Sequence, residues 1–247
     1  MMDFDSSASR STKPTTLGSE EVDVWCADLR LSSSALCQME KTLSPDEHDR
    51  AVQFHFPKDR RRFIAARGIL RDILSRYLRC PPTAPLFCYA HFGKPHLAPQ
   101  FSSGGLQFNL SHSDDLALYA VTYRGEVGVD LERIDAKHVE DGVAERFFSH
   151  NERTKIISLP ERARIAAFFD FWTRKEAYVK ARGGGLQIPL ESFDVSMDLV
   201  RSACSCEDQR AWTLRSLAVS PAYAAAIAAE GSDWRLRFWE WHMPPAE

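Results

Sequence analysis

Apolar residues recur at helical spacing over two long stretches, 57–79 and 161–182, and these stretches predict two long helices. Shorter apolar runs follow each helix and predict strands. After the first helix these runs are 86–91, 106–110 and 116–123, and after the second they are 193–200, 212–219 and 234–242. Residues 222–229 are ambiguous, because alanine favours helix by propensity while a position between two strand-like runs favours a strand. Because helices come first and strands afterwards in both stretches, the sequence predicts an α+β fold and not an alternating βαβ chain.

Each long helix is preceded by the same signal for a short capped helix. Ser44-Pro45-Asp46-Glu47 has a serine N-cap, a proline at the first helical position and a glutamate that can reach back to the cap. Ser149-His150-Asn151-Glu152 repeats the serine and the glutamate 105 residues later. At that spacing Phe63 aligns with Phe168. We therefore expect two similar halves, residues 21–124 and 125–247.

The remaining composition narrows the class of protein. Residues 1–20 are rich in Ser and Thr and predict a disordered leader. A net charge of −3 over 247 residues argues against a general nucleic-acid binder. The six cysteines are scattered and predict ordinary reduced thiols. No signal segment and no apolar stretch of about 20 residues is present, so we expect a cytoplasmic protein without a membrane anchor.

Two carboxylates stand on one side of the strand predicted over 127–132. Side chains alternate along a strand, so Asp130 and Glu132 share a face with Gly128 while the apolar residues point the other way. Close carboxylates repel each other unless a cation lies between them, and a hard divalent cation is the usual one. The alternative is a solvated outer face of the sheet. Pattern alone leaves both interpretations open.

The second long helix carries a stripe of Trp172, Glu176 and Lys180, spaced by four residues. In the simplest interpretation Glu176 and Lys180 form an exposed pair that contributes about 0.3 kcal/mol. In the functional interpretation Glu176 faces the acidic strand as a third oxygen ligand, and Lys180 lies one turn further on, close to a bound anion. The glycines at 183–185 then fit a helix C-cap better than a phosphate loop.

Further polar groups could contact phosphate. Gly93-Lys94-Pro95 forms a predicted turn, and Ser111 and His112 end a strand. Adjacent strand residues point apart, so a Ser–His nucleophilic pair is disfavoured, and the chain has no G-x-S-x-G elbow. The first long helix carries a basic cluster that is either a solvated face or a phosphate site, made of Lys58, Arg60, Arg61, Arg62, Arg67 and Arg71.

Five ordered motifs resemble one family. GVDLE at 128–132, ERFFS at 145–149 and FWTRKEAYVK at 171–180, with FGKP at 92–95 and NLSHS at 109–113, are similar to motifs of the 4′-phosphopantetheinyl transferases. The resemblance is to the two-domain branch that activates peptide and polyketide synthetases. It implies two pseudo-symmetric α+β halves with the active site in the cleft between them. It also implies transfer of phosphopantetheine from coenzyme A to a serine of an acyl- or peptidyl-carrier domain, releasing adenosine 3′,5′-bisphosphate, with Mg²⁺ or with Mn²⁺ in its place.

The resemblance also implies roles for individual residues. Asp130, Glu132 and Glu176 would bind the metal, Lys180 would stabilise the diphosphate, and Glu152 would be the general base, although Glu152 equally fits the capping box. Family members often carry a basic residue where this chain has Glu47, and Arg50 could replace it. The implied contacts to coenzyme A are Gly93, Lys94, Pro95, Ser111, His112 and Arg62, with Arg67 a weaker candidate.

Three classes of function remain open on the sequence. The chain could be the transferase, a metal phosphodiesterase that hydrolyses coenzyme A, or a regulatory module that only binds coenzyme A. The acids that catalysis needs are all present, which favours the transferase. We expect a monomer, because one chain supplies both walls of the cleft, and the expected partners are carrier domains.

Overall fold

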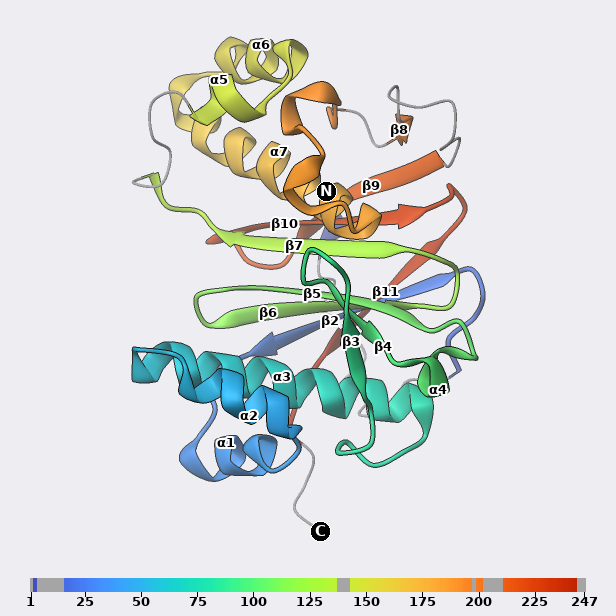
Figure 1. Cartoon of the computed structure of the whole chain (residues 1–247). Helices are drawn as coiled ribbons and strands as arrows, with labels where there is room; N and C mark the ends of the chain where they lie inside the picture. Colours follow the sequence, from blue (N-terminus) through green and yellow to red (C-terminus); the bar gives the residue numbers. More distant parts are fainter. Residues whose placement is uncertain (1, 4–15, 137–142, 197–198, 202–210, 244–247) are drawn as a thin grey trace.

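The computed structural model describes residues 2–3, 16–136, 143–196, 199–201 and 211–243. Two sheets lie face to face in the centre, and the long helices cover their outer sides (Figure 1). This arrangement confirms the predicted α+β class. None of the described helices is long and apolar enough to span a membrane.

The first sheet has the strand order β11-β2-β6-β5. The first long helix, α3, lies along its outer side (Figure 1). A two-stranded ribbon, β3-β4, lies beside it. The elements of this part of the chain are β2 (Glu21–Asp28), α1 (Ser33–Glu40), α2 (Pro45–Val52), α3 (Pro57–Leu78), β3 (Phe87–Tyr89), β4 (Pro95–Leu97), α4 (Pro99–Ser102), β5 (Gln107–Ser113) and β6 (Leu116–Thr122).

The second sheet has the order β1-β9-β10-β7, with β8 paired to β9, and α7 lies across its outer face. Its elements are β1 (Met2–Asp3), β7 (Val127–Arg133), α5 (Val143–Phe147), α6 (His150–Ser158), α7 (Glu161–Arg182), the 3-10 turns η2 (Gly185–Gln187) and η3 (Leu190–Ser192), β8 (Leu199–Arg201), β9 (Ala211–Ala218), β10 (Tyr223–Glu230) and β11 (Arg235–Glu240).

Apolar side chains fill the space between the two sheets. Val24 and Leu118 of the first sheet meet Val129 and Ile227 of the second, and all four are fully buried. Because strand side chains alternate, the opposite faces of both sheets remain available for the long helices. β5 and β7 are the edge strands of their sheets and lie next to each other, which creates the seam where the candidate site is built.

The helix starts agree with the sequence. Both capping boxes are present, at Ser44 with Glu47 and at Ser149 with Glu152. α7 has the predicted bounds, and α3 ends one residue early. The ambiguous residues 222–229 lie in strand β10. Burial between two neighbouring strands thus outweighs the helix propensity of alanine.

Two strand predictions differ from the structure. The run 193–200 was expected to be one strand, but residues 193–196 form no strand and β8 begins only at Leu199. The backbone carbonyls of Phe193 and Val195 accept hydrogen bonds from the side chains of Lys175 and Arg174. These side chains replace the neighbouring strand that a ladder would require.

The division of the chain into halves also differs in sheet membership. β11 was assigned to the second half, yet it pairs in parallel with β2 of the first sheet. Arg237 of β11 fixes this pairing through a 2.6 Å hydrogen bond from Nε to Oδ1 of the buried Asp23. Within the expected leader, β1 pairs with β9, while residues 1 and 4–15 lie outside the described part of the chain.

The repeat spacing changes between the short and the long helices. The serine caps are 105 residues apart, whereas the first residues of α3 and α7, Pro57 and Glu161, are 104 apart. The stretch from the serine cap to the first residue of the long helix is therefore one residue shorter in the second half than in the first. The expected alignment of Phe63 with Phe168 shifts by one position.

Candidate active site

The acidic face of β7 packs closely against α7. A Cβ atom on Gly128 would lie 2.1 Å from the carbonyl oxygen of Ala177 and 2.3 Å from the backbone nitrogen of Ala181. Only glycine allows the helix to approach the strand this closely. Asp130 follows on the same face and is 2% exposed. Alternation along the strand places Gly128 on this face, but it does not show that the site depends on Gly128.

Lys180 of α7 reaches the acidic strand. Its Nζ lies 2.5 Å from Oδ1 of Asp130 and 3.0 Å from Oγ of Ser111. The side chain keeps 30% of its surface exposed, so the ammonium is both paired and accessible. The structure thus brings together Asp130, Lys180 and Ser111, which are far apart along the chain.

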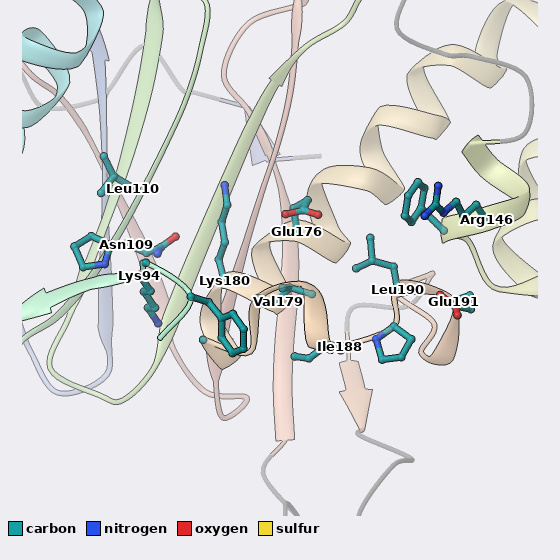
Figure 2. A pocket seen from close by; sticks show the side chains of 17 residues that line it. Lys94, Asn109, Leu110, Arg146, Glu176, Val179, Lys180, Ile188, Leu190 and Glu191 are labelled. Atoms are coloured by element: carbon teal, nitrogen blue, oxygen red, sulfur yellow. The ribbon is translucent and has the colours of Figure 1, made fainter. Parts of the chain in front are cut away.

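Glu176 lies one helical turn before Lys180, and the two side chains stand on the same side of α7 (Figure 2). Burial raises the pKa of the Glu176 carboxyl, the carboxylates of Asp130 and Glu132 raise it further, and Lys180 opposes them. Glu176 therefore senses both acids of β7 as like charges. This is the electrostatic relation that the sequence predicted for a third acid.

Polar side chains of β5 join the two halves directly above these acids. Asn109 Oδ1 accepts a hydrogen bond from the backbone N–H of Val129, and the hydroxyls of Ser111 and Ser113 accept from the next alternate N–H groups of β7. The same hydroxyls donate to Asp130 and Glu132, at 2.9 and 3.0 Å. Small polar residues with a period of two were the sequence signal for this ladder, and the sequence analysis missed it.

A cavity of about 550 Å³ opens beside Glu176 and Lys180 (Figure 2). Lys94, Asn109 and Leu110 form the wall that belongs to the first half. Arg146 and Phe147 of the second half also line it, together with the segment 188–191 after α7. The sequence did not single out Arg146 or the segment 188–191. Volumes of this size are typical of sites for small molecules.

The donor set fits a hard cation, but the carboxylates are not gathered around one point. Among the described residues, no group of three or more His, Cys, Asp or Glu side chains is close enough to form a ready metal site. Oδ2 of Asp130 is buried and has no hydrogen-bond partner. A buried, unpartnered carboxylate oxygen is costly, and a bound cation would satisfy it. The residues present therefore fit a metal that is held by oxygen ligands.

The predicted turn at Gly93, Lys94 and Pro95 lines the same cavity. Gly93 has a φ of 81°, which only glycine adopts without strain. Lys94 does not point into open solvent, because its Nζ donates to Oε2 of Glu126 at 2.7 Å and to the carbonyl oxygen of Ala181 at 3.1 Å. Lys94 thus holds the end of α7 against the first half.

Arg62 and His112 lie near the other end of the seam. Arg62 pairs with Asp114 and Asp115 in the turn between β5 and β6. His112 keeps an exposed edge. Partial desolvation, together with the cations Lys180 and Arg62, holds the pKa of His112 below its usual range. The imidazole is accordingly neutral at pH 7 in this state of the protein.

Two predicted site residues have other roles in the structure. Arg67 is buried, and it donates to Oε1 of Glu47 at 2.8 Å and to the hydroxyl of Tyr89 at 2.8 Å. These contacts hold it inside the first half, so the expected contact of Arg67 with coenzyme A is not supported. Arg50 is exposed and stacks over Phe63.

Glu152 was expected to be a general base, with a helix cap as the alternative. It is 0% exposed and is not among the residues that line the cavity. Oε2 accepts from the backbone nitrogen of Ser149 at 2.8 Å and lies 2.9 Å from Nζ of Lys175. A carboxylate so enclosed has no open path to a substrate hydroxyl, and we assign it a structural role.

Comparisons with known proteins identify the family of the chain. The family model described as "4'-phosphopantetheinyl transferase superfamily" matches residues 126–228. A second model, described as "4'-phosphopantetheinyl transferase, N-terminal", matches residues 30–124. The 4'-phosphopantetheinyl transferase HetI of Nostoc sp. is 41% identical over 226 residues, covering 92% of this chain and 94% of that protein. The 4'-phosphopantetheinyl transferase AcpT of Escherichia coli is 33% identical over 177 residues, covering 71% and 82%.

The boundary between the two matches lies in the connection between β6 and β7. A holo-[acyl-carrier-protein] synthase (AcpS) structure from Thermotoga maritima overlaps 44% of this chain and 64% of its own, with a TM-score of 0.33 and 19% identity, which is too little to carry an argument. The family matches define a transferase, and residues of both α+β halves line its cavity. The chain belongs to the 4′-phosphopantetheinyl transferase superfamily and is an enzyme of that class.

Proposed function

We propose that the protein transfers the 4′-phosphopantetheine group of coenzyme A to a serine hydroxyl of an acyl- or peptidyl-carrier domain. The serine oxygen forms a bond to the phosphorus that carries the pantetheine, the diphosphate bridge breaks, and adenosine 3′,5′-bisphosphate leaves. The observation that carries the proposal is that Glu176 and Lys180 line one cavity between the halves and that Lys180 pairs with the buried Asp130. Phosphoryl transfer needs mainly positioning and charge neutralisation, which these groups can provide.

Asp130, Glu132 and Glu176 would hold Mg²⁺, or Mn²⁺ in its place. The support is the unpartnered Oδ2 of Asp130 and the mutual repulsion of the three carboxylates. When bound, the cation would neutralise charge on the diphosphate oxygens. The site as it stands holds Lys180 against Asp130, so an ammonium already balances part of the acidic charge.

Lys180 would bind the diphosphate, since its Nζ lies 2.5 Å from Oδ1 of Asp130 and its side chain keeps 30% of its surface exposed. Ser111 orients both partners of the Lys180–Asp130 pair through its hydroxyl. The contacts to coenzyme A at Gly93, Lys94, Pro95, Ser111, His112 and Arg62 remain part of the proposal. For Lys94 and Arg62, binding phosphate would mean exchanging carboxylate partners for phosphate oxygens.

The test is to incubate the purified protein with coenzyme A, Mg²⁺ and an apo carrier domain and to weigh the carrier by mass spectrometry. A gain of about 340 Da is the mass that transfer of the phosphopantetheine group would add. Chelation of the metal should abolish the gain, and Asp130→Ala should do the same with an unchanged circular dichroism spectrum. Hydrolysis of coenzyme A without a carrier would instead indicate a phosphodiesterase. Thermal stabilisation without turnover would indicate a binding module.

A further inference from the structure

One wall of the cavity is formed by a segment that ends in the short 3-10 turn η3. The segment 188–191 contributes Ile188, Pro189, Leu190 and Glu191 to the lining, opposite the Lys94 side (Figure 2). It lies between the end of α7 and the irregular residues 193–196. Three of the four side chains are apolar, so this wall suits the carbon chain of a ligand better than its phosphates.

Lys175 fixes this wall from behind. Its Nζ donates to the carbonyl oxygens of Leu190 at 2.6 Å and Phe193 at 2.7 Å, and it lies 4.3 Å from the centre of the Phe193 ring. Lys175 is 0% exposed although it is adjacent to Glu176, which lines the cavity. Successive residues point in different directions around a helix. The same turn of α7 therefore presents Glu176 to the ligand and uses Lys175 to hold the wall.

Glu152 completes the support. Oε2 lies 2.9 Å from Lys175 Nζ, and Oε1 accepts from the backbone nitrogen of Val195 at 2.8 Å. Arg174 adds a hydrogen bond from Nε to the carbonyl oxygen of Val195 at 2.8 Å. The wall segment, at Leu190, and the residues that follow it, at Phe193 and Val195, are therefore tied to two helices. A buried polar network in which each group has its partner holds one geometry.

From these contacts we infer that Lys175 and Glu152 are positioning residues that set the wall for the pantetheine arm of the donor. The inference rests on the proposed function, because it takes coenzyme A as the ligand. Neither residue touches the reacting atoms. They act on the reaction only by fixing the position of the wall. The wall binds the pantetheine arm through apolar contacts with Ile188, Pro189 and Leu190. Loosening the wall removes binding of the arm in ground state and transition state alike.

The experiment compares two ligands that differ by the arm. Coenzyme A carries it and adenosine 3′,5′-bisphosphate lacks it, so the dissociation constants of both are measured by calorimetry for wild type, Glu152→Gln and Lys175→Met. We expect the constant for coenzyme A to rise about 10-fold, the constant for the bisphosphate to stay within about 2-fold, and kcat to stay within about 3-fold, the pattern of lost uniform binding.

Two other outcomes would overturn the inference. A fall of kcat by about 100-fold or more in Glu152→Gln, with both dissociation constants unchanged, would make Glu152 the general base. Equal weakening of both ligands would mean general loosening of the second half. A wild type that binds coenzyme A but modifies no carrier would defeat the proposed function while the binding comparison still decides about the wall. No binding of coenzyme A by the wild type would overturn both.

Folding is controlled by two further variants. Lys175→Met alone leaves the Glu152 charge buried without its cationic partner, which is strongly destabilising. The double variant Glu152→Gln with Lys175→Met removes both charges, and it should fold better than Lys175→Met while keeping the weakened binding of coenzyme A. Arg71→Met is the matched control, because Arg71 holds the equivalent Glu47 at 2.6 Å in the first half and does not line the cavity. It should lower stability and leave both dissociation constants unchanged.

Discussion

The two long helices have the same length and share an acid–base pair near their C-terminal ends, yet α7 lines the cavity beside Glu176 and α3 does not. α3 and α7 each have 22 residues. Counted from their first residues, Arg71 corresponds to Lys175, and both hold the capping-box glutamate of the preceding helix. One position further, Asp72 corresponds to Glu176 and Arg76 to Lys180, so each helix carries an acid followed four residues later by a base.

The difference lies in what covers these pairs. In the first half Asp72 is buried, where it pairs with Arg76 at 2.5 Å and accepts a hydrogen bond from Nε1 of Trp241 at 2.7 Å. Trp241 follows β11, the strand that crosses into the first sheet. In the second half Glu176 and Lys180 line the cavity. The repeated charge pattern supplies an acid–base pair in each helix, and exposure to a cavity decides which pair can contact a ligand.

The largest expected effect comes from closing the contact between β7 and α7. Gly128→Ala would place a methyl group 2.1 Å from a backbone oxygen of α7, where no side chain can give way. We expect loss of detectable transfer and destabilisation by about 3 kcal/mol, measured by carrier mass shift and by urea unfolding.

The matched change in the first half is Gly68→Ala, whose methyl group would lie 2.5 Å from Cβ of Met39. It should also destabilise the protein, by about 1–3 kcal/mol, but the folded fraction should keep its activity. Normal transfer by Gly128→Ala would show that the site does not need the close approach of α7.

The second prediction separates the two acid–base pairs. Glu176→Ala should lower kcat/KM by about 10²-fold or more without loss of stability, because deleting the carboxylate relieves its repulsion from Asp130 and Glu132. Steady-state kinetics with an apo carrier and thermal unfolding are the two measurements.

Its counterpart Asp72→Ala should do the reverse. The N–H of Trp241 and the guanidinium of Arg76 would lose their acceptor, which costs about 1–3 kcal/mol, while turnover per folded molecule should not change. An active Glu176→Ala variant would remove Glu176 from the proposed metal site.

The third prediction concerns the ladder between β5 and β7. Ser111→Ala leaves the N–H of Leu131 without an acceptor and removes the hydroxyl that contacts both Asp130 and Lys180. A stability loss of about 1–2 kcal/mol is expected, together with a fall in kcat of about 10-fold from the misplaced pair. Ser113→Ala, which touches Glu132 but not Lys180, should show a smaller fall. Equal effects of the two variants would mean that the hydroxyls only join the sheets.

Local signals accounted for the parts of the fold that the sequence predicted. Both capping boxes, the bounds of α7 and the alternation along β7 depend on contacts between residues a few positions apart, and all three were found. The two periods grouped Asp130 with Glu132 and Glu176 with Lys180, but they left open whether the two groups meet. What these periods did not show was that Gly128 is required, because its role is defined by the backbone of a helix 49 positions away.

Long-range side-chain contacts explain what the sequence did not reveal. Residues 193–196 have the apolar pattern of a strand, but Arg174 and Lys175 take their carbonyl oxygens. Glu152 was recognised as a helix cap, but its buried partner Lys175 was not, so a catalytic role was left open. Similarly, nothing local to β11 indicates that it pairs with β2 at the other end of the chain.

The smallest effect tests whether charges from both halves act on one residue of the seam. The neighbours that lower the pKa of His112 include Arg62 of α3 and Lys180 of α7. Below about pH 6.5 the unfolded chain takes up a proton at this histidine before the folded protein does. Stability should therefore fall slightly more in the wild type than in His112→Asn as the pH is lowered through this range, in urea unfolding at a series of pH values.

Adenosine 3′,5′-bisphosphate should reverse the difference if a phosphate faces the ring, because an anion favours the protonated imidazole. If stability depended on pH in the same way in both proteins, with and without the ligand, the charges of Arg62 and Lys180 would not act on His112.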